Sequence, residues 1–171
     1  MKYLFLFSFV IFFSIHTKAQ SIEVSGTAID TTNIIKLDST RTKDQLYSTG
    51  LEWFGNTYKN SKSVIQVQDK EAGTIIGKAT TALLAGTKVE YIDYTIKLYF
   101  KNGKIKYDIG VFEHSGYGII KNGEVLKTPW GAKGIIKRQY AALQKKCNEE
   151  IYNLTASINK AFVQTTTKND W

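Results

Sequence analysis

Few side chains in this sequence could act as an acid, a base or a nucleophile. The two histidines are His16 and His114, and Cys147 is the only cysteine. One cysteine and one histidine outside the N-terminal leader cannot form the usual zinc site of cysteine and histidine ligands. The glycines of Gly116-Tyr117-Gly118 lack the strand-to-helix context of a dinucleotide fingerprint, and no nucleophile-elbow motif is present. We therefore expect no metal, no cofactor and no catalytic residue.

One enzymatic alternative stays open, a hydrolase-like reaction that uses His114. Cys147 is a poor partner, because it falls on the apolar stripe of a predicted helix, which favours a buried and unreactive thiol. Ser115 is the next residue, but neighbours at a strand end point to opposite faces. Glu113 and Tyr117 are the other nearby polar groups. This alternative predicts that His114 lines a concave pocket with a polar partner in hydrogen-bonding reach.

Binding is favoured over catalysis by the alternation along residues 91–101. Every second residue from Ile92 to Phe100 is apolar or aromatic and would face a core, whereas Lys97, Tyr99 and Lys101 would face the other way. Asn102-Gly103 is the strongest hairpin signal in the chain and predicts a type I′ turn.

On the return strand, the same alternation divides residues 105–114 between two faces. It predicts core positions for Ile105, Tyr107, Ile109 and Val111. The opposite face would then carry the rest of a binding surface, with two residues contributed by the loop that follows. The predicted surface comprises Lys97, Tyr99, Lys101, Lys106, Phe112, His114, Tyr117 and Trp130.

Lysines set between aromatic rings can hold an anionic, flat or sugar-like ligand by charge and stacking. Two simpler interpretations of this face stay open. Its lysines could form ordinary cross-strand pairs with Asp93 or Asp108, or the face could pack on another protein or a second copy.

The elements that would position this surface are predicted from the residues before it. An edge strand is predicted around residues 33–38, and Thr42-Lys43-Asp44-Gln45 has the form of a capping box that begins a helix. That helix carries Trp53 and Phe54 on an apolar stripe. Strands are predicted at residues 64–68 and 74–84, with Gly73 in the left-handed position of the turn between them.

After His114, the pattern changes to a glycine- and aromatic-rich loop. A second Asn-Gly pair, Asn122-Gly123, predicts a small hairpin between residues 119–120 and 125–126. A long helix over residues 132–164 follows, and Glu149 and Glu150 are expected on its solvated side. Together these elements predict a two-layer α+β domain of order β-α-β-β-β-β-α, with the helices on one face of an antiparallel sheet.

The N-terminus has the form of a secretory signal peptide. Lys2 is followed by a short apolar run, and Ala19 is a small residue at the expected cleavage position. We predict a signal peptide over residues 1–19, a single domain over residues 20–164 and a flexible tail over residues 165–171. No later stretch is apolar enough to span a membrane, and no cysteine follows the run, so a lipoprotein anchor is not expected.

Charge suggests the kind of partner. Removing Lys2 and Lys18 from the 23 basic side chains leaves 21 against 15 acidic ones, so the formal charge falls from +8 to +6. Such an excess suits an anionic partner, although an ordinary basic surface would look the same.

Two features carry a resemblance to a known family. They are the run Val64-Ile65-Gln66 leading to Asp69-Lys70-Glu71-Ala72-Gly73-Thr74-Ile75-Ile76-Gly77-Lys78, and the preceding helix with Tyr47 and Trp53-Phe54. Over residues 36–114 the chain resembles the domain-of-unknown-function family 4468. The resemblance implies an exported protein of Bacteroidetes-type bacteria with a TBP-like fold, and it brings no activity with it.

We therefore expect an exported domain, periplasmic or secreted, that binds a partner or an anionic envelope component through the open face of its sheet, or that has a structural role. Nucleic acid is not an expected partner, because an exported protein seldom meets it and a shared fold does not carry DNA recognition.

Overall fold

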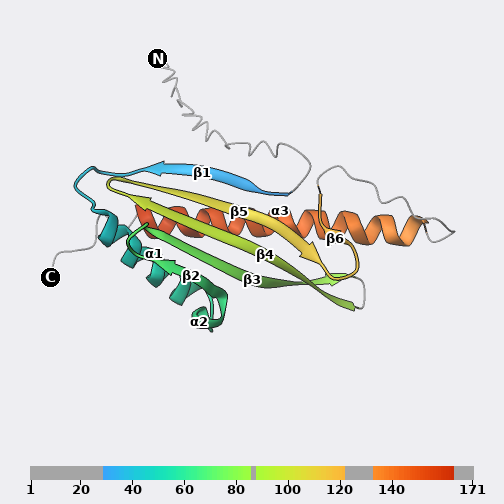
Figure 1. Ribbon diagram of the computed structural model, residues 1–171. Coiled ribbons are helices and arrows are strands. Elements are labelled where there is room, and N and C mark those ends of the chain that lie inside the picture. The colour runs from blue at the N-terminus through green and yellow to red at the C-terminus, as the bar shows by residue number, and fades with distance from the viewer. Residues whose placement is uncertain (1–28, 86–87, 122–132, 164–171) are drawn as a thin grey trace, which may run out of the picture.

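A computed structural model describes residues 29–85, 88–121 and 133–163 (Figure 1). Its sheet is antiparallel, with the strand order β1-β5-β4-β3-β2, and a short sixth strand pairs with β5. The strands are β1 (Thr31–Lys36), β2 (Ile65–Asp69), β3 (Thr74–Ala85), β4 (Lys88–Lys101), β5 (Lys104–His114) and β6 (Gly118–Ile119). The helices are α1 (Lys43–Thr57), α2 (Ser61–Val64) and α3 (Lys133–Val163).

Both long helices lie along one face of the sheet, as Figure 1 shows. The predicted α+β order is confirmed. The one-turn helix α2 was not predicted, and the two-residue strand β6 lies one residue before the short strand predicted at residues 119–120. Every second residue of β4 between Ile92 and Phe100 is buried against the helices. The described part of the predicted α3 stripe is buried as well, including the Cys147 thiol: Tyr140, Leu143, Cys147, Ile151, Leu154, Ile158 and Phe162.

Helix α1 begins at the predicted capping box. The Thr42 hydroxyl accepts the Gln45 N–H, and the Gln45 side chain accepts the Thr42 N–H at 2.9 Å. In the middle of the helix, a Cβ on Gly50 would lie 2.5 Å from Cζ of Phe100. Gly50 therefore lets the helix approach the sheet more closely than any other residue would allow.

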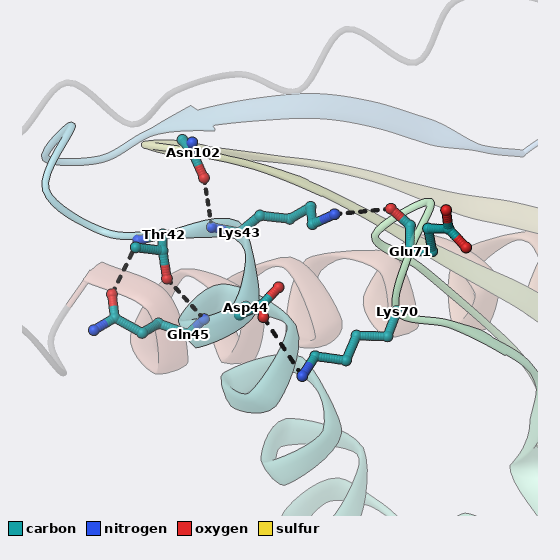
Figure 2. A network of polar contacts seen from close by, with 7 residues as sticks. All are labelled: Thr42, Lys43, Asp44, Gln45, Lys70, Glu71 and Asn102. Atoms are coloured by element: carbon teal, nitrogen blue, oxygen red, sulfur yellow. Dashed lines mark hydrogen bonds and ion pairs between the residues drawn. The ribbon is translucent and has the colours of Figure 1, made fainter.

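The turn between β2 and β3 fastens the start of α1 to the sheet (Figure 2). Lys43 Nζ donates to the Glu71 carbonyl at 2.8 Å, and the Lys43 backbone N–H donates to Asn102 Oδ1 at 2.7 Å. Lys70 and Asp44 add an exposed ion pair at 3.5 Å. Gly73 has φ +65°, as predicted. The most distinctive stretch of the sequence thus has a structural role, because its turn is held against the start of α1.

The turn between β4 and β5 differs from the prediction in its type. Gly103 has φ +69°, but Asn102 does not have a positive φ, so the turn is not type I′. Contacts outside the hairpin hold it: the Leu37 N–H donates to the Gly103 carbonyl, and the Gly103 N–H donates to the Arg41 carbonyl, each at 2.8 Å.

A β-bulge in β5 overturns the predicted division of its faces. Asp93 pairs with Glu113 and Thr95 pairs with Gly110, so two β5 residues, Val111 and Phe112, lie opposite one residue of β4. Val111 takes φ +54° and is half exposed. One inserted residue moves every later side chain to the other face. Phe112 is consequently buried under the helices instead of lying on the open face.

The segment after His114 also departs from the prediction. Residues 118–119 form β6 and pair with β5, and the predicted partner strand at 125–126 lies outside the described residues. The predicted signal peptide and the C-terminal tail lie outside them as well. None of the described helices combines the length and hydrophobicity that a membrane-spanning helix needs.

Candidate functional site

The second face of the sheet has no covering helix or strand among the described residues. Strand pairing aligns its side chains in rows across the sheet. Near the β4–β5 turn, Lys36 of β1, Lys104 of β5 and Lys101 of β4 form one row, because Lys104 is the Cα partner of both other lysines. In the next row Ile34 pairs with Lys106, which pairs with Tyr99.

These two rows surround a hollow of about 430 Å³, which we call the basic hollow. Four of its seven lining residues are lysines. Its full lining is Ile34, Lys36, Tyr99, Lys101, Lys104, Ile105 and Lys106.

The first row of the basic hollow places three like charges side by side. Neighbouring strands are about 4.8 Å apart, and like charges directly opposite each other destabilise a sheet. Lys36, Lys101 and Lys104 have no ion pair with any residue that the structure describes. The row is therefore an electrostatic cost to the fold that an anion in the basic hollow would offset.

The second row of the basic hollow supplies a ring and a partly neutralised charge. Lys106 Nζ lies 5.4 Å from the centroid of the Tyr99 ring and 3.5 Å from Asp108 Oδ1. Ile34 is 55% exposed beside them. An aromatic ring and an exposed isoleucine next to lysines without ion pairs provide both stacking surface and charge.

The structure divides the predicted surface into residues that it brings together and residues that it does not. Tyr99, Lys101 and Lys106 line the basic hollow. Lys97 lies on the same face of the sheet, where its Cα partner is Asp108. Trp130 lies outside the described residues. Ile34, Lys36 and Lys104 were not predicted. Ile34 and Lys36 become neighbours of the others only through the pairing of β1 with β5, whereas Lys104 is the partner of Lys101 across the β4–β5 hairpin.

The open-face placement of His114 was wrong, because the bulge turns its side chain under the helices, where it is 6% exposed. Its Nδ1 accepts the Gly116 N–H at 3.0 Å, so the proton of the neutral ring is on Nε2 and points to Glu90 Oε2 at 3.0 Å. The Tyr117 ring stacks on it at 4.9 Å and contacts Tyr140, so Tyr117 also belongs to the packing.

This arrangement gives the hydrolase-like alternative no support. A polar partner is in reach of His114, as that alternative requires, but both ring nitrogens are engaged within the protein and His114 does not line the basic hollow. His114, Glu90 and Tyr117 together link the start of β4 and the end of β5 to the loop after β5.

A second buried polar network lies between the sheet and the helices. Tyr94 donates to Glu150 Oε1 at 3.0 Å, and its hydroxyl is 3.1 Å from that of Tyr58. Thr81 donates to the other Glu150 oxygen at 3.2 Å, so the predicted solvated position of Glu150 was wrong. Burial raises the pKa of Tyr58 to about 12, and burial together with Tyr58 and Glu150 raises the pKa of Tyr94 well above its usual range. These groups link helix to sheet, and none of them lines the basic hollow.

Metal binding and thiol chemistry have little basis among the described residues. No group of three or more histidine, cysteine, aspartate or glutamate side chains there is placed to bind a metal ion. Burial raises the pKa of the Cys147 thiol to about 12, which keeps it protonated and unreactive at neutral pH.

Comparison with known proteins identifies the family. A crystal structure of a TBP-like protein from Parabacteroides distasonis matches with a TM-score of 0.59 at 15% identity, over 78% of this chain and 92% of the other. A DUF4468 family protein from Bacteroides ovatus matches with a TM-score of 0.52 at 13% identity, over 77% and 86%. No protein of curated function matches the sequence significantly. Residues 32–115 match the domain of unknown function DUF4468, so this chain carries a DUF4468 domain with a TBP-like fold.

Proposed function

We propose that the protein is exported and that its domain binds an anionic saccharide component of the cell envelope in the basic hollow. One observation carries the proposal: the row of Lys36, Lys104 and Lys101, aligned across three strands with no carboxylate partner among the described residues. A fold tolerates such a row most readily when it has an anion to bind.

The remaining residues of the basic hollow favour a saccharide over a bare ion. A bare phosphate needs charge alone, whereas the Tyr99 ring and Ile34 offer apolar area beside the charges. Sugar rings stack on aromatic side chains through their apolar faces, and their carboxylate or phosphate substituents would meet the lysines. Because lysine is a flexible point charge and not a planar fork, the hollow suits spaced anionic groups better than one fixed geometry.

The binding experiment compares two variants of equal charge. In one, Lys36, Lys101 and Lys104 are changed to Glu. In the control, three exposed lysines away from the basic hollow, Lys59, Lys62 and Lys88, are changed to Glu. Binding to alginate, to neutral dextran and to phosphatidylglycerol vesicles is measured at low and high salt.

We expect the wild type and the control to bind alginate and not dextran, with an affinity that falls as salt rises. The basic-hollow variant should bind alginate at least about tenfold more weakly than the control. Equal losses in the two variants would show that net charge alone is responsible and would refute the proposed site. Binding to the vesicles but not to alginate would assign the basic hollow to lipid headgroups instead.

A separate measurement tests whether the protein is exported. The residues before Gln20 have the order of a signal peptide, with Lys2 before an apolar run and Ala19 at its end. Mass spectrometry of the protein recovered from the periplasm or medium should give an N-terminus near Gln20. Recovery of the uncleaved chain from the cytoplasm would contradict export without affecting the binding result.

A further inference from the structure

Two-thirds of β3, residues 78–85 of its twelve, forms an unpaired edge of the sheet. Strand β2 pairs with residues 74–77 of β3 only, whereas β4 pairs with the whole of β3, from Thr74 to Ala85. On their outer side, residues 78–85 have no strand partner within the part of the chain that the structure describes. In Figure 1 this part of β3 extends beyond the short β2. An unpaired edge presents a row of backbone N–H and C=O groups to a further strand.

This edge lacks the devices that usually prevent strand addition. Residues 79–85 include no charged residue and no proline. The hydroxyls of Thr80 and Thr81 are directed to Asp93 and Glu150, at 2.6 and 3.2 Å, and not to the edge. Leu84 is 69% exposed at its end. Apart from Lys78 at its start, which forms an ion pair with Asp93, the edge is thus uncharged, and it is long and partly apolar.

The opposite edge of the sheet is protected. Asn33 Oδ1 of β1 accepts the Ile34 N–H at 2.7 Å, which occupies one backbone donor with a side chain of the same strand. Lys36 adds a charge, and its Cα partner is another lysine. Pairing of β3 with β1 of another copy would also give an open-ended assembly, because the two surfaces differ.

From this contrast we infer that the free edge of β3 pairs with the same edge of a second copy, antiparallel about a two-fold axis at Ala82. In that register Ala82 lies opposite Ala82, and Thr80 lies opposite Leu84. The two side chains of each pair lie on the same face of the sheet, because the paired positions differ by an even number of residues. No charge meets another charge, so the pairing has no electrostatic obstacle along the strand.

The dimer would leave the basic hollow accessible. Ala82 is the Cα partner of Tyr91, and Lys101 is ten residues further along β4. At about 3.4 Å per residue that is roughly 30 Å away. A two-fold axis perpendicular to the sheet places both hollows on the same side of one continuous sheet. Dimerisation does not depend on what the basic hollow binds.

The test is the mass of the purified protein in solution, measured by sedimentation from micromolar to millimolar concentration. We expect a monomer–dimer equilibrium. Ala82→Lys and Ala82→Glu should each weaken dimerisation about tenfold or more, and an equimolar mixture of the two should restore it as a heterodimer. Thr32→Lys, an exposed position on β1 at the opposite edge, is the matched control and should dimerise as the wild type does.

Cross-linking provides an independent measurement if the charged variants misfold. Ala82→Cys should form a disulfide-linked dimer under mild oxidation, whereas Thr32→Cys should not. The native Cys147 is buried and will not compete. A wild-type protein that stays monomeric at every concentration would overturn the inference. Equal effects of Ala82→Lys and Thr32→Lys, or a mixture that stays monomeric, would overturn it too.

Discussion

The ring of Phe112 stacks on the ring of Tyr94 with 5.1 Å between their centroids, on the face of the sheet that the helices cover. An uninterrupted β5 would place Phe112 on the opposite face. The stack exists because Val111 occupies the extra position of the bulge. The positive φ of Val111 should lower the free energy of unfolding by a measurable amount.

Val111→Gly should raise the free energy of unfolding by up to about 1 kcal/mol. A β-branched residue at φ +54° is strained, and glycine accepts this conformation at the expense of some chain entropy. Little burial is lost, because Val111 is 50% exposed. The control is Val89→Gly, at a valine of similar exposure without positive φ, which should lose about 0.5–1 kcal/mol. Equal losses in urea denaturation would mean that the bulge is not strained.

Two glycines of α1 should respond to alanine in opposite directions. A Cβ at Gly50 would lie 2.5 Å from the Phe100 ring, so Gly50→Ala should destabilise the protein by about 1–3 kcal/mol despite its better helix propensity. A Cβ at Gly55 would meet nothing within 4 Å, so Gly55→Ala should stabilise it by up to about 1 kcal/mol. Thermal unfolding of both variants measures the difference. A gain in both would show that the helix can move away from the sheet.

The protein should lose stability at alkaline pH. Tyrosine in the unfolded chain ionises near pH 10, whereas burial raises the pKa of folded Tyr58 to about 12 and that of Tyr94 further. The unfolded chain therefore releases its protons first, and the free energy of unfolding falls as pH rises from about 10 to 12. Tyr58→Phe should make this fall shallower, while Tyr152→Phe, at an exposed tyrosine, should not. Identical profiles in urea titrations from neutral to alkaline pH would contradict the assignment.

Repulsion within the lysine row should lower the stability of the protein at low salt, and added salt should remove this effect. Lys104 is flanked by Lys36 and Lys101, so Lys104→Gln should stabilise the unliganded protein by a few tenths of a kcal/mol, about the size of a cross-strand pair, at low ionic strength. The gain should vanish at high salt, because exposed charges are screened. Lys88→Gln is the control, since the Cα partner of Lys88 is Ala85. Equal changes at both positions, or a gain that persists in high salt, would show that the row is not strained by repulsion.

Local signals were sufficient for much of the fold. The α3 stripe, the capping box at Thr42, the alternation of β4 and the left-handed Gly73 all follow from patterns within one element, and the structure confirms each of them. The layer order was also predictable, because one apolar face per element admits few arrangements.

The errors share one physical origin, which is competition between local pattern and contacts from elsewhere. Alternation assigned Val111 to the core, but a bulge changes the parity of a strand without any marker that single-residue propensity can read. Asn102-Gly103 predicted a type I′ turn, whereas hydrogen bonds from Leu37 and to Arg41 hold a different one.

The sequence by itself determined most of the elements and the covered face of the sheet. It also determined three residues of the basic hollow, Tyr99, Lys101 and Lys106, because period-two alternation places them on one side of two adjacent strands. Only the tertiary structure decided that Lys36 joins Lys101 and Lys104 in the lysine row and that His114 is buried. The reason is that strand pairing between distant segments and the position of a bulge depend on the register of the whole sheet, which no local pattern specifies.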